Sequence, residues 1–316
     1  MSAASIQKPL LVTAQVALTL ALIYYSCRNL DIAEVLGDLK SITLTCILTC
    51  FALGIVQIAL LVERWRAVLN SLELNPASGA LLQGILIERL FAQILPAAIG
   101  GDLARGAYLI RQKQDATITI ISIIYDRISG ILGLILLAGL CALLFKAVRL
   151  PAALAVTPIV LLYAMLIGMI VTARLPRSWI ELVFGANSGL RLKSLALAGH
   201  ALIRDARYSG TSLILSALVH ALSCLMMVAL ARDLAPHVSA IEIGLSTPVL
   251  FLAITLPLTI AGWGVREQTA LLIFGYAGAS ANDAIAISLA FGLLQLAIAL
   301  ASGVVFLGRS FAASRG

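Results

Sequence analysis

Eight charged residues interrupt otherwise apolar stretches of the sequence, half of them arginines and half carboxylates. The guanidinium group of arginine carries a fork of donors that matches the oxygens of a phosphate group. The carboxylates could hold these arginines when no ligand is present, or could bind a cationic group. Because a charge in the middle of a membrane costs about 2.5 to 3.5 kcal/mol on insertion scales, such residues must pair or face water. The candidate substrate-binding residues are Glu88, Arg89, Asp102, Arg105, Asp126, Arg127, Arg266 and Glu267.

Asp126 and Arg127 lie inside the apolar block 116–145. With a rise of 1.5 Å per residue, Asp126 lies roughly 15 Å along a helix from the start of this block, close to the middle of a bilayer. Neighbouring helical residues point about 100° apart, so these two residues need separate partners. We expect them to pair with charges in the segments around 78–96 and 243–283. Such pairs could lock these segments in place or line a substrate path.

A short pattern occurs twice, and it places the helix breaks. Residues 95–105 align with residues 256–266, and Leu, Pro, Ile, Gly and Arg coincide at identical spacing. Proline removes a backbone donor and glycine permits turns that other residues resist, so each copy should interrupt a helix. Paired interruptions in two halves of a membrane protein are typical of a transporter site, although either alone could be an ordinary loop. The predicted helix-break residues are Pro96, Gly100, Gly101, Pro257, Gly262 and Gly264, and their glycine amides could face an anion.

The elements that carry these residues are predicted to be membrane helices. Of the 316 residues, 61% are hydrophobic and only 12% are charged, which excludes a water-soluble globule, a disordered chain and a disulfide-built secreted module. A helix needs about 20 apolar residues to cross a bilayer. The fold class is therefore an all-α polytopic membrane protein. Its six clear spans are 10–27, 41–62, 116–145, 152–173, 211–231 and 284–307.

The basic residues predict the orientation of the chain in the inner membrane. If 78–96 and 243–283 each enter and return as re-entrant hairpins, fourteen of the 22 lysines and arginines, Arg64 and Arg105 among them, fall on the side of the N-terminus and five on the other. Because cytoplasmic loops carry the excess of these residues, we expect both termini in the cytoplasm. The chain is predicted to be one membrane domain, residues 1–316. Its halves, about 1–150 and 151–316, would form an inverted repeat.

Two further segments are open to more than one interpretation. The first apolar block is predicted to be an uncleaved anchor helix, because Tyr25 and Ser26 before Cys27 do not form a small-residue cleavage site. The basic stretch 174–210 is either a cytoplasmic loop or an in-plane helix that binds anionic lipid.

Neither a cofactor nor a metal is predicted. The five cysteines lie in or beside apolar blocks and are expected to pack there, and Cys46 and Cys50 lack a further ligand for zinc. A phosphate-binding loop is absent because Lys40-Ser41 and Lys193-Ser194 each follow leucine rather than glycine. The three histidines form no HExxH pair, and His220 is expected to be a packed, hydrogen-bonded residue. The sequence therefore does not predict an enzyme.

The combined motifs resemble the lysylphosphatidylglycerol synthase transmembrane region family over nearly the whole chain. The resemblance rests on Glu88-Arg89, on GGD-x-x-R at 100–105, on Asp126-Arg127 before Ser129-Gly130, and on GWGVRE at 262–267. The acid before the central arginine is commonly Glu in that family, whereas this chain has Asp126.

The resemblance implies a lipid-flipping membrane domain like the one joined to an aminoacyltransferase domain in the multiple peptide resistance factor proteins. We find no such soluble domain in this sequence, and we expect that the chain does not transfer an aminoacyl group itself. The expected function is a flippase-like lipid translocase. Its expected partners are membrane lipids with anionic phosphate headgroups, and a lipid-modifying enzyme is possible, but no nucleic acid. The alternatives are a non-transporting membrane partner of a lipid synthase or glycosyltransferase, and an intramembrane enzyme.

Overall fold

The computed structural model describes residues 3–28, 32–95, 100–144, 152–174, 205–255 and 258–313. The ordered elements in these ranges are helices, and no strand occurs among them, so the all-α prediction is confirmed. Most of the basic stretch 174–210 lies outside the described residues, as do Pro96 and Pro257 of the predicted helix breaks.

Four helices are long and apolar enough to cross a membrane: α3 (Leu44–Ser71), α6 (Ala116–Leu144), α10 (Ala206–Leu234) and α13 (Ala281–Ala313). The other two predicted spans form α1 (Ala3–Cys27) and α7 (Ala152–Arg174), whose described apolar parts are shorter. Large apolar side chains point outward, among them Leu48, Ile167 and Val304. Such outward apolar faces are what helices in contact with lipid present. The chain is therefore membrane-spanning, and a total of six spans remains a prediction.

Helix α3 continues past the predicted apolar block 41–62. Arg64 and Trp65, which end the apolar pattern, are both buried in the structure. Arg64 pairs with Asp126, and the indole nitrogen of Trp65 donates to the hydroxyl of Ser122 at 3.1 Å. Arg64, counted among the fourteen basic residues on the side of the N-terminus, therefore has its charge satisfied by an interior partner within a helix.

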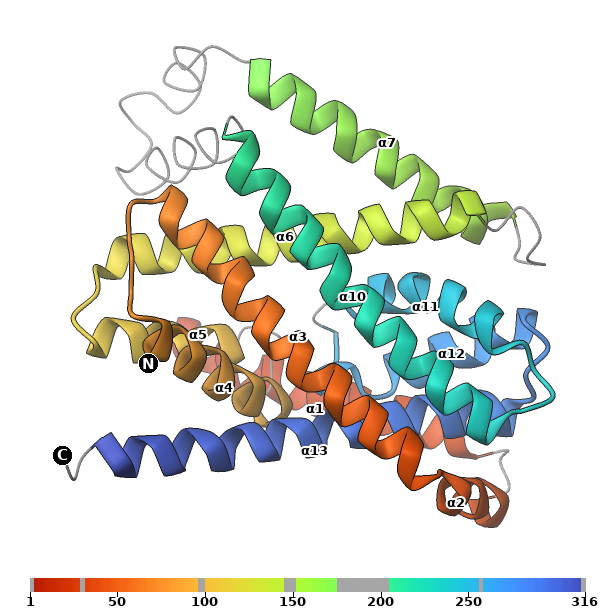
Figure 1. The fold of residues 1–316 in the computed structure, drawn as a ribbon. Coiled ribbons are helices and arrows are strands. Elements are labelled where there is room, and N and C mark those ends of the chain that lie inside the picture. The colour runs from red at the N-terminus through yellow and green to blue at the C-terminus, as the bar shows by residue number, and fades with distance from the viewer. Residues whose placement is uncertain are drawn as a thin grey trace.

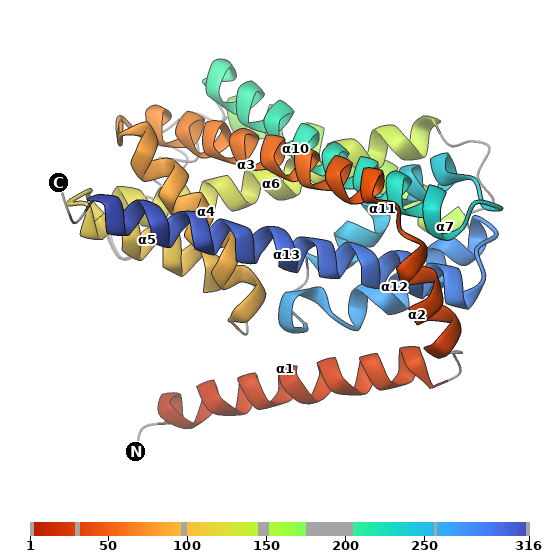
Figure 2. The ribbon, with the colours of Figure 1, turned by 60° about the horizontal axis from the view of Figure 1, so that its bottom comes forward.

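Two helical hairpins occupy opposite ends of the molecule. The first consists of α4 (Ser78–Ile94) and α5 (Gly100–Arg111), and the second of α11 (Ala240–Ile254), the short 3-10 helix η1 (Ile260–Gly262) and α12 (Val265–Tyr276). Each hairpin turns near the centre and returns to the end from which it started, and the first lies at the end that holds both chain termini (Figures 1 and 2). Helix η1 packs against α4, so the turns of the two hairpins meet.

The glycines at the two breaks have different roles. Gly262 and Gly264 have φ angles of +77° and +85°, which glycine adopts without the strain that other residues incur. Gly100 and Gly101 instead form the first residues of α5. A Cβ atom on Gly101 would lie 2.6 Å from the backbone oxygen of Glu88, so glycine here permits close packing of α5 on α4. Gly100 and Gly101 were predicted to permit a turn. They are helical instead, and the close packing of α5 on α4 is what requires glycine at position 101.

The four long helices α3, α6, α10 and α13 pack around the centre together with the inner ends of the two hairpins. Asp233 at the end of α10 fixes the start of α3, because its Oδ2 accepts bonds of 2.8 Å from both the backbone nitrogen and the hydroxyl of Thr43. Helix α7 packs on α6, whereas α1 packs on α12 and lies along one side of the molecule (Figure 2). The helix α2 (Ile32–Ser41) packs on α13.

Candidate functional site

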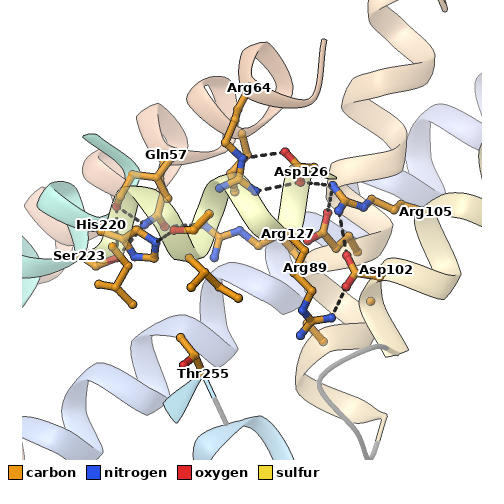
Figure 3. A pocket seen from close by; sticks show the side chains of 18 of the residues that line it. Gln57, Arg64, Arg89, Asp102, Arg105, Asp126, Arg127, His220, Ser223 and Thr255 are labelled. Carbon is orange, nitrogen blue, oxygen red and sulfur yellow. Dashed lines mark hydrogen bonds and ion pairs between the residues drawn. The ribbon is translucent and has the colours of Figure 1, made fainter. Parts of the chain in front are cut away.

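A cavity of about 370 Å³ lies where α3, α4, α5, α6 and α10 meet, with further lining from the end of α11 and from α13 (Figure 3). Gln57, His220 and Gln295 line it from the middle turns of α3, α10 and α13. At 1.5 Å per residue, these side chains lie at least about 20 Å along the axis from either end of their helices. The cavity is therefore deep inside the membrane-spanning bundle.

Asp126 of α6 is the most deeply buried charge of the cavity, with no exposed side-chain surface. Arg64 of α3 binds it with two hydrogen bonds, from Nε at 2.7 Å and from Nη2 at 2.9 Å. Arg105 of α5 donates to its Oδ2 at 2.8 Å. Figure 3 shows the carboxylate between the two guanidinium groups. One carboxylate thus joins three helices, and bidentate arginine geometry makes such bonds strong.

Arg105 connects this carboxylate to the first hairpin. Its Nη2 donates to Oδ1 of Asp102 at 2.8 Å, and its Nη1 lies 3.1 Å from Oε2 of Glu88. The guanidinium group also stacks over the ring of Trp65, 4.8 Å from the centroid. A cation over an aromatic face is stabilised by the ring quadrupole. Arg105 therefore has no single partner but holds α4, α5 and α6 together.

Arg127 forms an ion pair with Asp102 at the edge of the cavity. Its side chain is 37% exposed, more than any other arginine of this network. The same two residues also line a neighbouring apolar groove of about 410 Å³ between α5 and α6. The groove wall includes Leu103, Ile120 and Ile124. The pair thus stands at the junction between a charged cavity and an apolar groove.

Arg89 differs from the other arginines of the cavity because its partners are neutral. Its guanidinium donates to the amide oxygens of Gln57 and Gln295, which come from α3 and α13. Gln57 is held in turn, because its amide nitrogen donates to the backbone oxygen of Val219 at 2.9 Å and to the hydroxyl of Ser223 at 2.7 Å. No carboxylate among the described residues forms an ion pair with Arg89.

The cavity therefore has an excess of positive charge. Ion pairs join three of its arginines to its three carboxylates, whereas the fourth arginine is held by amides. His220 donates from Nε2 to the backbone oxygen of Gly130 at 3.1 Å. A buried charge without a counter-charge is costly unless an ion or water compensates it. The site is thus suited to an anion beside Arg89.

Six of the eight predicted binding residues line this one cavity: Glu88, Arg89, Asp102, Arg105, Asp126 and Arg127. The third span does pair with the first helical hairpin, through Arg105 with Asp126 and Arg127 with Asp102, but these partners belong to α5 and lie beyond the expected segment 78–96. Asp126 and Arg127 also have separate partners, as their directions on the helix require. Arg105, also counted on the side of the N-terminus, is buried within α5, with only 2% of its side chain exposed.

Arg266 and Glu267 do not line the cavity. Glu267 accepts from the amide of Gly264 at 2.6 Å and from Nη2 of Arg266 at 2.7 Å, and Ser288 of α13 donates to it at 2.9 Å. The backbone amide of Gly264, which was predicted to be available to an anion, therefore already donates to the carboxylate of Glu267. The expected pairing of the second hairpin with α6 is therefore wrong. A carboxylate in the first turn turns back to the helix start, where unpaired amides attract it.

Sequence reasoning missed five polar residues of the cavity: Gln57, Arg64, Ser223, Thr255 and Gln295. The two glutamines carried a usable signal, since each stands alone in the middle of a long apolar block, where an amide needs a partner. His220 was expected to be packed and hydrogen-bonded, which is confirmed, but its place in the cavity was not foreseen.

The fold and the cavity define an all-helical integral membrane protein with a buried charged site. The chain belongs to the family described as the Lysylphosphatidylglycerol synthase TM region, which matches residues 12–303. The resemblance noted in the sequence is thereby confirmed, and membership in this family is consistent with a role related to membrane lipids. A search of the curated proteins finds no match to the chain.

Proposed function

We propose that this protein is a flippase-like lipid translocase that moves the phosphate headgroup of a lipid through the central cavity. The observation that carries the proposal is Arg89, a cavity-lining arginine bound by two neutral amides rather than by a carboxylate. A phosphate cannot cross hydrocarbon uncompensated, because burying an isolated ion costs many kcal/mol. Arg89 would provide the missing counter-charge with a fork of donors suited to phosphate oxygens.

The hairpins support a route from both membrane surfaces to this cavity. They enter from opposite ends and turn near the centre, and Gly101 in the first turn of α5 and Thr255 at the end of α11 line the cavity. In the proposed mechanism both are re-entrant, the two halves form an inverted repeat, and rocking of one half against the other exposes the headgroup alternately to each side. Broken backbone at membrane depth is tolerated only where protein buries it or where it lines a cavity.

The groove between α5 and α6 would accommodate an acyl chain while the headgroup occupies the cavity. Its lining is almost entirely aliphatic, and Asp102 and Arg127 are common to both spaces. A lipid lying across this junction would place its polar part against the charged network and its chain against Leu103 and Ile124. Reversible opening of the ion pair between Asp102 and Arg127 would then admit the headgroup.

We further propose that the protein lies in the cytoplasmic membrane with both termini in the cytoplasm. The two chain ends lie at the same end of the molecule, and the distribution of basic residues supports this orientation (Figure 2). In this proposal the protein acts as a transporter without cofactor or enzymatic step. A lipid-modifying enzyme that supplies its substrate remains a possible partner.

The test is transbilayer movement of fluorescent phosphatidylglycerol in proteoliposomes, with protein-free vesicles as the baseline. We expect movement above this baseline for the wild type, and a loss of roughly 10- to 100-fold for Arg89→Gln, because a hydrogen bond to a charged group contributes about 1.5 to 3 kcal/mol. The matched control is Arg66→Gln on α3, since Arg66 is only partly buried, does not line the cavity and pairs with the exposed Glu63. Absence of movement with the correctly inserted wild type would contradict the proposal and favour a non-transporting partner.

A further inference from the structure

Every carboxylate that lines the cavity already has an arginine partner. Glu88 pairs with Arg105, Asp126 with Arg64 and Arg105, and Asp102 with Arg105 and Arg127. An ammonium group that entered the cavity would have to share one of these acids with a guanidinium group. It would also increase the positive charge that Arg89 already leaves in excess, and like charges brought together in a buried site repel strongly.

The side chains that form hydrogen bonds with Arg89 are polar but uncharged. Gln57 and Gln295 accept from its guanidinium, and Ser223 accepts from the amide nitrogen of Gln57. The amide nitrogen of Gln295 has only a weak contact with the sulfur of Met226 at 3.9 Å, so this donor can take a better acceptor. A hydroxyl group next to a phosphate bound at Arg89 would meet such neutral partners.

We infer that the cavity selects an anionic lipid whose headgroup carries hydroxyl groups and no ammonium group, as in a phosphoglycerol or another phosphopolyol. This inference rests on the proposed function and names its substrate class. The excess charge of Arg89 binds the phosphate, and the amides and hydroxyl beside it bind the polyol. The paired carboxylates hold arginines in position and do not bind the headgroup. The family name refers to a lysine-bearing lipid, whereas each acid that lines this cavity already forms an ion pair with an arginine, although Oε2 of Glu88 accepts no hydrogen bond.

The first test compares three lipids with identical acyl chains. Phosphatidylglycerol is anionic with hydroxyl groups, phosphatidylmethanol is anionic without them, and phosphatidylethanolamine carries an ammonium group. Binding to the protein in detergent is measured by native mass spectrometry, and movement is measured in proteoliposomes. We expect the order of binding to be phosphatidylglycerol, then phosphatidylmethanol, then phosphatidylethanolamine, with roughly tenfold between first and last.

The second test changes the selectivity with one atom. Gln295→Glu places a carboxylate next to Arg89 and gives the cavity as many acids as arginines. Gln295 is the better position than Gln57, because the amide nitrogen of Gln57 donates two hydrogen bonds of 2.9 Å or less that a carboxylate could not make. We expect the preference for phosphatidylglycerol over phosphatidylethanolamine to fall roughly tenfold or to reverse. Gln295→Leu, which adds no charge, should weaken binding without reversing the preference.

The readouts separate this inference from the proposed function. Preferential binding of phosphatidylglycerol without movement would support the inference and contradict the translocase. Equal or stronger binding of phosphatidylethanolamine by the wild type would overturn the inference even if lipids move. Soluble glycerol phosphate should compete with bound phosphatidylglycerol better than phosphoethanolamine does, because the headgroup and not the acyl chain is recognised. Equal competition, or an unchanged preference in Gln295→Glu, would also overturn it.

Discussion

The two hairpins place an arginine at the same position of the same motif. Arg105 ends the pattern in the first hairpin and Arg266 ends it in the second. Both side chains are buried, with 2% and 5% exposed surface. Both stack on a tryptophan, Arg105 on Trp65 at 4.8 Å and Arg266 on Trp263 at 4.4 Å. The two arginines are therefore alike in their burial and in their contact with an aromatic ring.

They differ in where the partners of the arginine come from. Arg105 pairs with carboxylates on α4, α5 and α6, and the resulting network lines the cavity. Arg266 pairs with the neighbouring residue Glu267 and is covered by α13, where a Cβ atom on Gly292 would lie 2.1 Å from its Nη2. The repeated motif therefore predicts a buried arginine. The helices that face this arginine decide whether it lines a cavity, as Arg105 does, or forms a closed structural ion pair, as Arg266 does with Glu267.

The largest expected effect comes from removing the acid shared by three helices. Asp126→Asn would leave Arg64 and Arg105 without their common carboxylate, and breaking a buried pair costs about 3 to 5 kcal/mol of folding free energy. Thermal and chemical unfolding in detergent would measure the loss. The exposed pair of Glu63 and Arg66 is the control, since Glu63→Gln should cost at most about 1 kcal/mol. Equal stability of the two variants would show that the ion pairs around Asp126 contribute no more to folding than an exposed pair does.

A smaller effect is expected from closing the space beside Arg266. Gly292→Ala would force its guanidinium to move, although Glu267 and Ser288 hold it, and overpacking of this kind costs about 1 to 3 kcal/mol. Unfolding in detergent is again the measurement. Gly303→Ala is the matched control on α13, because its nearest neighbour is a methyl group of Leu90 at 2.9 Å, which can rotate away. A Gly292→Ala protein as stable as the wild type would mean that the side chain of Arg266 can move aside without losing its bonds to Glu267 and Ser288.

The smallest effect on stability is expected at the exposed edge of the network. Arg127→Gln breaks the ion pair with Asp102, but the arginine is 37% exposed, so the cost should be at most about 1 kcal/mol. We expect a lower rate of lipid movement, but a smaller decrease than in Arg89→Gln, because the lost charge lies at the junction and not at the phosphate position. Rates in proteoliposomes at matched insertion would measure this. Movement lowered more by Arg127→Gln than by Arg89→Gln would place the main headgroup contact at the junction.

Much of the fold could be predicted from local sequence. Long apolar blocks predicted the helices. The intervals between α4 and α5 and between α11 and α12 fall within the two copies of the repeated pattern, whose prolines lie outside the described residues. The ends of α3 could not be predicted, because the interior position of Arg64 depends on Asp126, which follows 62 residues later.

The candidate site was predictable only in part. Charges in apolar sequence identified six cavity residues, since such charges need interior partners. Gln57 and Gln295 were missed because a single amide in a span can also bond to its own backbone, and only the packing of α3 against α4 and α13 brings both to Arg89. The separation of Arg266 from the cavity was equally invisible, because its position in the motif matches that of Arg105.

The central claim is that Arg89 of the first hairpin belongs to the lipid site, whereas Arg266 of the second hairpin forms a structural ion pair with Glu267. The most direct measurement is the initial rate of phosphatidylglycerol movement per folded molecule for Arg89→Gln and for Gly292→Ala. The account predicts that Arg89→Gln keeps its stability and loses at least roughly tenfold in rate, whereas Gly292→Ala loses stability and keeps the wild-type rate. A wild-type rate in Arg89→Gln would contradict the account.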